Sequence, residues 1–466
     1  MSLSFFDDRQ YIRAFDATIG VVAYFNKDTL VMKSDEPSGS FFLMSEELTT
    51  YYMYEDVVRP TSASLTELMT TFAGWVYAWK LSSTLTSQDN SKLVEVSAGF
   101  GKDARFVDER IEGSGTSVFS PDLMGCVLSV GPGVGRCVRQ TRAFVCVQGV
   151  SKVATVSGTL FTSSSLTVQG VGRIGAFDEA VASVPTSGNG FFFQYDGAPQ
   201  GGLAIAVRSR GQPDLVVPRT SWNVDHMDGA SGFALDAAVP NTFVVSWSGR
   251  ETITVTFGVM FHGYLRVCHT EGLVRMGGCV PLRWELQGGA LGTMTMGQGA
   301  GTISTVGRFV PRAASRSFDT GLGVRTVPPA PTEAVPLVSL RLSPAAARTS
   351  LSLVRVTLLN LEPDGLARWH LLIGSALVGA SFVSPGSPGG DSLAEVSVSE
   401  TGVTGGEVVS GGYLSGCSPV VVELPCPLVL GSGIDGTPDV ATVVATWIRG
   451  VVLLNATLEW VESQNY

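Results

Sequence analysis

The sequence predicts an all-β protein, with two β-sandwich (jelly-roll-like) domains preceded by a small α/β N-terminal segment. Three observations lead to this fold class. The chain contains 55 glycines and is 44% hydrophobic but only 15% charged, a composition that favours strands joined by tight turns. Apolar side chains alternate with polar ones over long stretches, and glycine-rich turns separate these stretches. The length of 466 residues exceeds that of a typical domain, so we expect more than one hydrophobic core.

The first predicted sandwich spans residues 96–305. Residues 253–261 alternate large apolar side chains with polar or small ones, which is typical of a half-buried strand. Residues 191–195 and 203–207 flank the Asp196-Gly197 turn and have the pattern of a β-hairpin. A meander of this kind suits one large sandwich of roughly 200 residues, for which a jelly roll is the leading candidate.

A proline-rich linker is predicted at residues 306–335, followed by a second sandwich at residues 336–466. Pro328 and Pro329 are consecutive, and such prolines favour an extended, semi-rigid segment that cannot complete a central ladder. Beyond the linker the two-residue period returns, for example at residues 354–358. The second sandwich therefore covers about 130 residues.

Residues 1–95 form a different kind of segment. Ser64 and Glu67 have the spacing of a capping box, in which each side chain bonds a free backbone amide of the other. Apolar residues then follow at three- and four-residue steps through Trp79, which predicts an amphipathic helix. We interpret residues 1–95 as an anchoring or docking segment.

The charge of the chain excludes several classes of partner. The net charge is −10 and the pI is near 5.0, without the basic stripe that nucleic acid or an anionic membrane surface requires. No run approaches the ~18 apolar residues of a membrane helix. The N-terminus also lacks the basic and apolar regions of a signal peptide. We expect no direct nucleic-acid binding, no membrane span and folding in a cytosol.

The seven cysteines do not have the spacing of a metal or redox site. Their number is odd, and no two lie two or three residues apart, as zinc ribbons and redox dithiols require. We therefore expect buried free thiols. The cysteines are Cys126, Cys137, Cys146, Cys268, Cys279, Cys417 and Cys426.

Two loops resemble calcium sites only in part. Residues 225–229 contain Asp225 and Asp228, but Asp236 occupies the position where an EF-hand needs glutamate. Residues 435–439 have the pattern of a turn by the same reasoning. Two of the four histidines are close in sequence, but no carboxylate recurs beside them at ligand spacing. The sequence therefore predicts no metal site and no cofactor.

Catalytic motifs are also missing from the sequence. Residues 131–135 are rich in glycine but lack the Lys-Ser/Thr pair that grips phosphate and magnesium. Residues 113–115 do not form the G-x-S-x-G nucleophile elbow. Neighbouring carboxylates such as Glu46 and Glu47 are common on surfaces. We expect that the protein is not an enzyme.

One tryptophan stands apart from the others. Most tryptophans occupy alternating segments, where packing in the core is their usual role, whereas Trp222 precedes the turn at residues 225–229. β-Sandwiches commonly present aromatic rings to sugars at such loops. We therefore predict Trp222, Asp225 and Asp228 as ligand contacts in a loop.

The order of several motifs resembles a known group of proteins. The group comprises virion-associated and hypothetical structural proteins of large double-stranded DNA viruses and tailed phages, some of which carry a fibre or capsid label. The likeness covers about three quarters of the chain, and residues 1–95 match nothing in the group. The motifs lie at residues 106–117, 136–142, 173–178, 190–197, 221–225, 228–236, 255–259, 267–269, 336–342, 404–406, 410–413 and 434–439.

The resemblance implies a structural role in a virus particle, as a minor capsid, vertex or tail and fibre protein. Its partners would be other virion proteins and copies of itself, and the chain would be made and folded in the host cytoplasm. The alternative is a receptor- or glycan-binding β-sandwich protein displayed on the particle. A third hypothesis is a β-rich hydrolase whose carboxylates meet only in the folded chain, because fold alone does not determine function.

Overall fold

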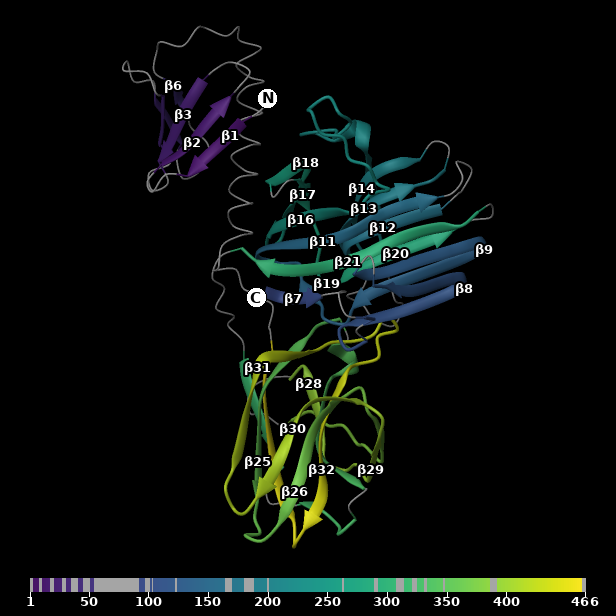
Figure 1. The fold of residues 1–466 in the computed structure, drawn as a ribbon, viewed down its shortest axis with the longest axis vertical. Helices are drawn as coiled ribbons and strands as arrows, with labels where there is room; N and C mark the ends of the chain where they lie inside the picture. The colour runs from purple at the N-terminus through teal and green to yellow at the C-terminus, as the bar shows by residue number, and fades with distance from the viewer. Residues whose placement is uncertain are drawn as a thin grey trace. The chain divides into compact units, whose positions relative to one another are not determined.

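A computed structural model gives the fold of the chain (Figure 1). It describes residues 92–462 and six earlier strands; in the first range it omits residues 97–100, 103, 122–123, 164–169, 180–187, 199–200, 262–263, 289–291, 307–313, 321–324, 331–332, 347 and 386–391. The chain divides into two compact units, residues 1–83 with 223–236 and residues 84–222 with 237–466. In the described residues, no helix is long and apolar enough to cross a membrane.

The strands described before residue 92 form one antiparallel sheet. Its six strands pair in the order in which they follow one another along the chain. They are β1 (Leu3–Asp7), β2 (Tyr11–Asp16), β3 (Val21–Asn26), β4 (Val31–Ser34), β5 (Phe41–Met44) and β6 (Tyr51–Met53). The helix predicted after Ser64 lies outside the described residues.

The next part of the chain builds a single sheet of 13 strands. Eleven strands follow the order β15-β14-β13-β12-β20-β9-β21-β11-β16-β17-β18, while β7 pairs with β21 and β8 with β9. The strands are β7 (Lys92–Val96), β8 (Val107–Ser120), β9 (Gly125–Thr141), β11 (Gly149–Ser163), β12 (Gly170–Phe177), β13 (Gly190–Asp196), β14 (Gly202–Arg208), β15 (Leu215–Pro218), β16 (Asn241–Gly249), β17 (Ile253–Phe261), β18 (Tyr264–Val274), β20 (Leu282–Gly288) and β21 (Met294–Thr305). A short 3-10 helix, η1 (Arg219–Ser221), follows β15.

This sheet curls until its two ends pack face to face. Strands β13 and β16 are separated by five strands in the sheet order, yet the Phe193 ring lies 4.9 Å from the Phe243 ring and 5.6 Å from the Phe257 ring. Phe191 contacts Trp247 at 5.6 Å in the same layer. All five aromatic side chains are fully buried. The curled sheet therefore forms a β-sandwich with its own core.

A small ladder between β10 (Val145–Cys146) and β19 (Cys279–Val280) corrects one prediction. It places Cys146 opposite Cys279, and a disulfide bond joins the two residues. The expectation of free thiols is therefore wrong for this pair, because residues 133 positions apart in sequence meet only in the fold. Free thiols are present at Cys126, Cys137, Cys268 and the exposed Cys417.

The C-terminal part of the chain forms a second sandwich from two five-stranded sheets (Figure 1). One has the order β22-β33-β25-β31, with β23 also paired to β33, and the other has the order β28-β24-β32-β26-β30. The strands are β22 (Ala314–Asp319), β23 (Arg325–Thr326), β24 (Ala334–Leu342), β25 (Leu351–Asn360), β26 (Leu366–Ile373), β28 (Ala394–Ser397), β30 (Glu407–Ser415), β31 (Val420–Leu430), β32 (Val440–Arg449) and β33 (Leu453–Glu462). A two-stranded ladder of β27 (Ala376–Val378) and β29 (Gly402–Thr404) and the 3-10 helix η2 (Pro344–Ala346) complete it. Side chains of both five-stranded sheets, among them Trp369 and Trp460, fill its core.

The all-β fold class with two β-sandwiches is thereby confirmed. The predicted hairpin is present as β13 and β14, which pair from Gly190 opposite Arg208 to Asp196 opposite Gly202. Within residues 306–335, for which we expected a linker, β22 and β23 pair with β33. These residues therefore contribute to the second sandwich.

Buried polar contacts join the two sandwiches. The Arg348 guanidinium, which is 1% exposed, lies 3.2 Å from the Asp178 carboxylate at the end of β12. It also donates hydrogen bonds to the carbonyl oxygens of Gly433 and Ile434, at 3.0 and 2.9 Å. Arg142 pairs with Asp439 at 2.6 Å. Arg348 and Asp178, and likewise Arg142 and Asp439, therefore pair opposite charges from different sandwiches.

Candidate ligand-binding groove

One face of the curled sheet carries charged side chains in register. On β20, Leu282, Trp284 and Leu286 enter the core, whereas Arg283, Glu285 and Gln287 point to the opposite face. Residues directly opposite one another in an antiparallel ladder share a face. Glu285 lies opposite Arg173 of β12, and Gln287 lies opposite Arg136 of β9. Neighbouring strands therefore assemble one charged surface.

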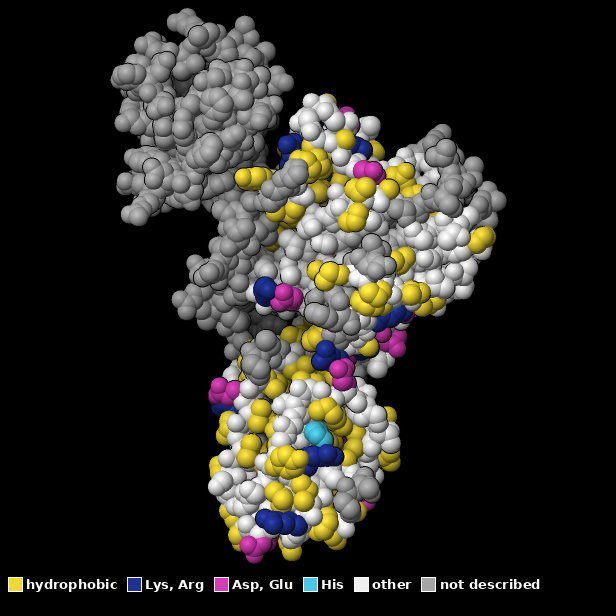
Figure 2. All heavy atoms as spheres, in the orientation of Figure 1, with side chains coloured by type: hydrophobic (Ala, Val, Ile, Leu, Met, Phe, Trp, Pro, Cys, Tyr) yellow, Lys and Arg dark blue, Asp and Glu magenta, His cyan; other side chains and the backbone are white. Residues whose placement is uncertain are grey.

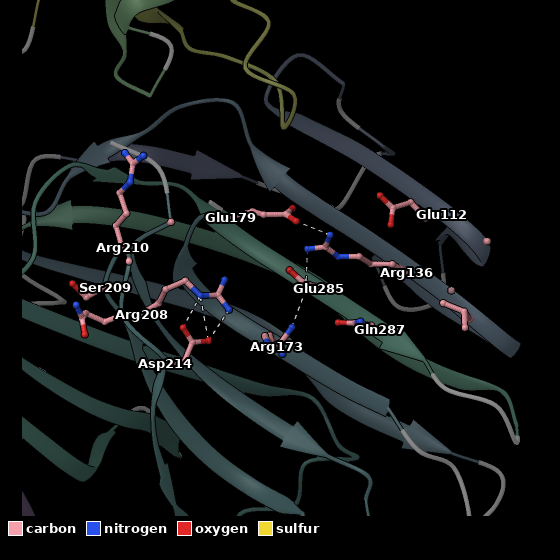
Figure 3. Close-up of a pocket in the computed structure, with 16 residues that line it drawn as sticks. Glu112, Arg136, Arg173, Glu179, Arg208, Ser209, Arg210, Asp214, Glu285 and Gln287 are labelled. Atoms are coloured by element: carbon pink, nitrogen blue, oxygen red, sulfur yellow. Dashed lines mark hydrogen bonds and ion pairs between the residues drawn. The ribbon is translucent and has the colours of Figure 1, made fainter. Parts of the chain in front are cut away.

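This surface borders a groove of about 720 Å³ (Figure 3). Strands β8, β9, β12, β14 and β20 and the segment after β14 contribute its walls. The lining residues are Glu112, Gly113, Val134, Gly135, Arg136, Arg173, Glu179, Gly188, Arg208, Ser209, Arg210, Gly211, Gln212, Asp214, Glu285 and Gln287.

Glu285 is the centre of the charge network. Its carboxylate is 2% exposed and lies 2.8 Å from Arg283, 2.9 Å from Arg173 and 3.2 Å from Arg136. Burial alone would raise the pKa of Glu285, but the three guanidinium groups outweigh burial and hold this pKa well below its ordinary value. Glu285 is therefore ionised and fixes the orientation of the arginines around it.

Two further carboxylates extend the network. Glu179 lies 2.9 Å from Arg136 and 3.2 Å from Arg283; burial would raise the pKa of Glu179, but these arginines lower it. Asp214 binds Arg208 through Nε at 3.0 Å and Nη2 at 2.8 Å, in a fork geometry. Figure 3 shows Arg173 between these two groups of side chains.

A small apolar cluster supports the arginines from below. Phe177, Phe192 and Ala206 are fully buried and contact one another. The Arg208 guanidinium lies 5.0 Å from the centre of the Phe192 ring, and Arg173 lies 6.0 Å from it. Cations over aromatic faces are held by the ring quadrupole. The guanidinium groups of Arg173 and Arg208 are therefore each held by an ion pair and by the Phe192 ring.

The residues predicted as loop contacts lie elsewhere. Trp222 is 3% exposed, donates its indole N–H to the Val217 carbonyl at 3.2 Å, and meets the Phe193 ring edge to face. Its ring is consequently part of the core and has no face open to a sugar. We expected Trp222 to be exposed in a loop and to contact a ligand, but its side chain is buried in the core.

The two aspartates of that prediction stabilise their own loop. Asp225 accepts a hydrogen bond from the Met227 amide at 2.7 Å, and from the Ser231 hydroxyl at 2.8 Å. Asp228 accepts a hydrogen bond from the Ala230 amide at 3.0 Å. The bonds from the Met227 and Ala230 amides, each two residues beyond its aspartate, are those of Asx turns. In the described residues, no group of three or more His, Cys, Asp or Glu side chains could hold a metal ion.

The groove residues were not singled out from the sequence. Several lie in stretches that carried the resemblance, such as residues 136–142 and 173–178. One pattern could have identified them. Residues 283–287 place Arg, Glu and Gln on every second position of a strand whose other positions are large and apolar. Such a strand has one face in the core and one charged face, so it predicts a polar surface on the outer face of its sheet.

No protein-family model matches the sequence, and neither does any curated protein. Solved structures with a related sandwich include the Emp47p carbohydrate recognition domain, with 12% identity, a TM-score of 0.33, and 47% of this chain and 98% of that chain covered. A legume lectin-like domain from Entamoeba histolytica has 10% identity, a TM-score of 0.32, and coverage of 47% and 99%. For peanut lectin the values are 11%, 0.29, 46% and 97%. Similarity at this level assigns no function to this chain.

Proposed function

We propose that this protein is a glycan-binding β-sandwich protein whose ligand occupies the groove of the 13-stranded sheet. The observation that carries the proposal is the ion-paired lining of a cavity of about 720 Å³. Sites for small ligands commonly fall between about 300 and 1,000 Å³, so the groove has room for a short oligosaccharide.

The chemistry of the lining suits a ligand with many hydroxyl groups. A sugar hydroxyl both donates and accepts hydrogen bonds, so its site needs carboxylate or carbonyl oxygens beside N–H donors. Arg208 and Asp214, which are both partly exposed, supply both within one ion pair. Because each partner is already held by the other, little side-chain entropy is lost when a ligand binds.

The same pairing favours binding over hydrolysis. A glycoside hydrolase needs one carboxyl group with a raised pKa to protonate the leaving group. In the groove, Glu285 and Glu179 have lowered pKa values because arginines surround them. We therefore propose that the protein binds its ligand without converting it.

A glycan array followed by calorimetry on the full chain tests the proposal. We expect at least one oligosaccharide class to bind in a one-to-one complex. Replacing Gln287, an exposed lining residue, with Trp should obstruct the groove and weaken binding at least ~10-fold, a loss of about 1.4 kcal/mol. Gln148 is also exposed but lies outside the lining, and Gln148→Trp is the matched control. Absence of binding to any glycan by the folded protein would contradict the proposal.

Our second proposal is that this protein has a structural role in a virus particle. Its partners would then be other virion proteins and further copies of this chain. Strands β30 and β31 end the orders of their sheets in the described residues, and edge strands of this kind can pair with another chain. They expose Val408, Tyr413 and Val421, each more than half accessible. Figure 2 shows hydrophobic side chains at the surface of the C-terminal sandwich, to which both strands belong.

Light scattering on the purified chain tests this second proposal. We expect a trimer or larger assembly that persists in a calcium chelator. Replacing Tyr413 with Lys should dissociate it, because a charge on the edge strand opposes pairing. A monomer at every accessible concentration would count against assembly through copies of this chain.

A further inference from the structure

The lining of the groove is less acidic than the chain as a whole. The chain has a net charge of −10, whereas the lining holds four arginines and four carboxylates. The arginines are Arg136, Arg173, Arg208 and Arg210, and the carboxylates are Glu112, Glu179, Asp214 and Glu285. Positive and negative charges are therefore balanced in the lining, and the position of each arginine decides where an anion could bind.

Arg173 has hydrogen-bonding capacity that the described protein groups do not use. Its Nε donates to Gln194 at 2.9 Å and its Nη1 to Glu285 at 2.9 Å. Nη2 makes no hydrogen bond within the part of the chain that the structure describes. A guanidinium has five N–H donors in a plane, so the two on Nη2 remain for a ligand. The side chain is 17% exposed and lines the groove.

The surroundings of Arg173 concentrate positive charge at this point. Arg173 and Arg136 bind the same Glu285 oxygen, and Arg173 and Arg208 lie over the same Phe192 ring. Burial lowers the pKa of Arg173, and the charge of Arg208 lowers it further against the opposing effect of Glu285. An additional negative charge here would relieve the repulsion between the arginines.

We infer that the ligand of the groove is an acidic glycan, with a carboxylate or sulfate group that accepts hydrogen bonds from Arg173 Nη2 near Arg136 and Arg208. This inference rests on the proposed function and names its substrate class. Guanidinium groups bind carboxylate and sulfate oxygens in a planar fork and form stronger bonds to them than to neutral hydroxyls. Arg173 would therefore select charged sugars over neutral ones of the same shape.

Calorimetry on the full chain with matched oligosaccharides tests the inference. The probes are oligogalacturonate, its methyl ester, a sulfated oligosaccharide and a neutral cello-oligosaccharide. We expect oligogalacturonate or the sulfated probe to bind at least ~10-fold more tightly than the uncharged probes. This advantage should shrink at high salt, where charges near the surface are screened within about 3–4 Å.

Substitutions locate the selectivity. Arg173→Gln should remove most of the preference for the charged probes, and Arg173→Lys, which keeps the charge but loses the fork, should retain part of it. Arg355→Gln is the matched control, because Arg355 is also an ion-paired arginine on a strand but lies on β25, outside the groove. The comparison of probes on the unaltered chain stands even where a variant fails to fold.

The outcomes distinguish a failure of the acidic-glycan inference from a failure of the glycan-binding proposal. Equal affinity for oligogalacturonate and its methyl ester, with no binding of the sulfated probe, would overturn the acidic ligand and leave glycan binding intact. Preference for the sulfated probe alone would support the inference and identify the anion. Failure of the folded chain to bind any glycan, charged or neutral, would overturn both.

Discussion

Removing Arg348 is the substitution that most directly tests how the two sandwiches are joined. Its guanidinium is the ion-pair partner of Asp178, whose carboxylate is fully buried. Replacing Arg348 with Met keeps much of the side-chain volume and removes the charge. Breaking a buried ion pair from one side costs about 3–5 kcal/mol, because the remaining charge is left uncompensated. The two hydrogen bonds to backbone carbonyls are also lost, so we expect the upper end of this range.

The pH dependence of that cost has a definite sign. Burial raises the pKa of Asp178 above its ordinary value, and Arg348 opposes the increase. Without Arg348 the folded-state pKa rises further, so the folded protein binds a proton that the unfolded chain releases above about pH 4. Stability then falls as the pH rises through the interval between the two pKa values. The deficit of the variant should be larger near pH 8 than near pH 5.

Denaturant unfolding followed by tryptophan fluorescence measures this deficit. Arg355→Met removes an exposed ion pair and should change the stability little at any pH, because solvent screens such a pair. Adding Asp178→Asn to Arg348→Met removes the buried charge and should recover part of the loss. A cost below about 1 kcal/mol for Arg348→Met near pH 8, independent of pH, would refute the reasoning.

Three further predictions concern stability. Burial lowers the pKa of Lys152 from 10.5 to about 8. Between these two pH values the unfolded chain holds a proton that the folded chain has released, so the free energy of unfolding should rise with pH. Lys152→Met should abolish this part of the rise, as measured by urea unfolding. Reducing the disulfide between Cys146 and Cys279, or replacing both residues with Ser, opens a loop of 133 residues. By the loop-entropy model the free energy of unfolding should fall by at most about 5 kcal/mol. Guanidinium unfolding with and without reductant measures this loss. Gly431→Ala would drive a Cβ into the Arg142 carbonyl oxygen and should lower the free energy of unfolding by about 1–3 kcal/mol. Gly272→Ala, whose Cβ would meet nothing within 4 Å, is the control and should change this free energy little in the same denaturant titration.

Local periodicity was sufficient to predict the strands but not their assembly. The alternation over residues 253–261 gives the bounds of β17, Ile253–Phe261, because a half-buried strand repeats every two residues whatever lies around it. The disulfide could not be predicted in the same way. Cys146 and Cys279 lie in separate short strands, and their pairing depends on the order of the whole sheet.

The binding groove illustrates the same limit. Its charged side chains come from strands that are neighbours in space but distant in sequence, such as β9 and β20, which place Arg136 opposite Gln287. Trp222 was misplaced for a related reason. Its position beside a turn suggested exposure, but the curled sheet brings Phe193 against its ring and buries it. Burial is a property of the assembled sandwich and not of the neighbouring residues in sequence.

The two faces of β12 and β20 give the protein a way to change its ligand without changing its fold. In β12, Ile174 and Ala176 belong to the core while Arg173 faces the groove. In β20, Trp284 belongs to the core while Glu285 lines the groove. Substitutions at alternate positions can therefore alter recognition while the interior remains as it was. A lineage could diversify its specificity one side chain at a time, and a directed library confined to those positions would sample new ligands on an unaltered scaffold.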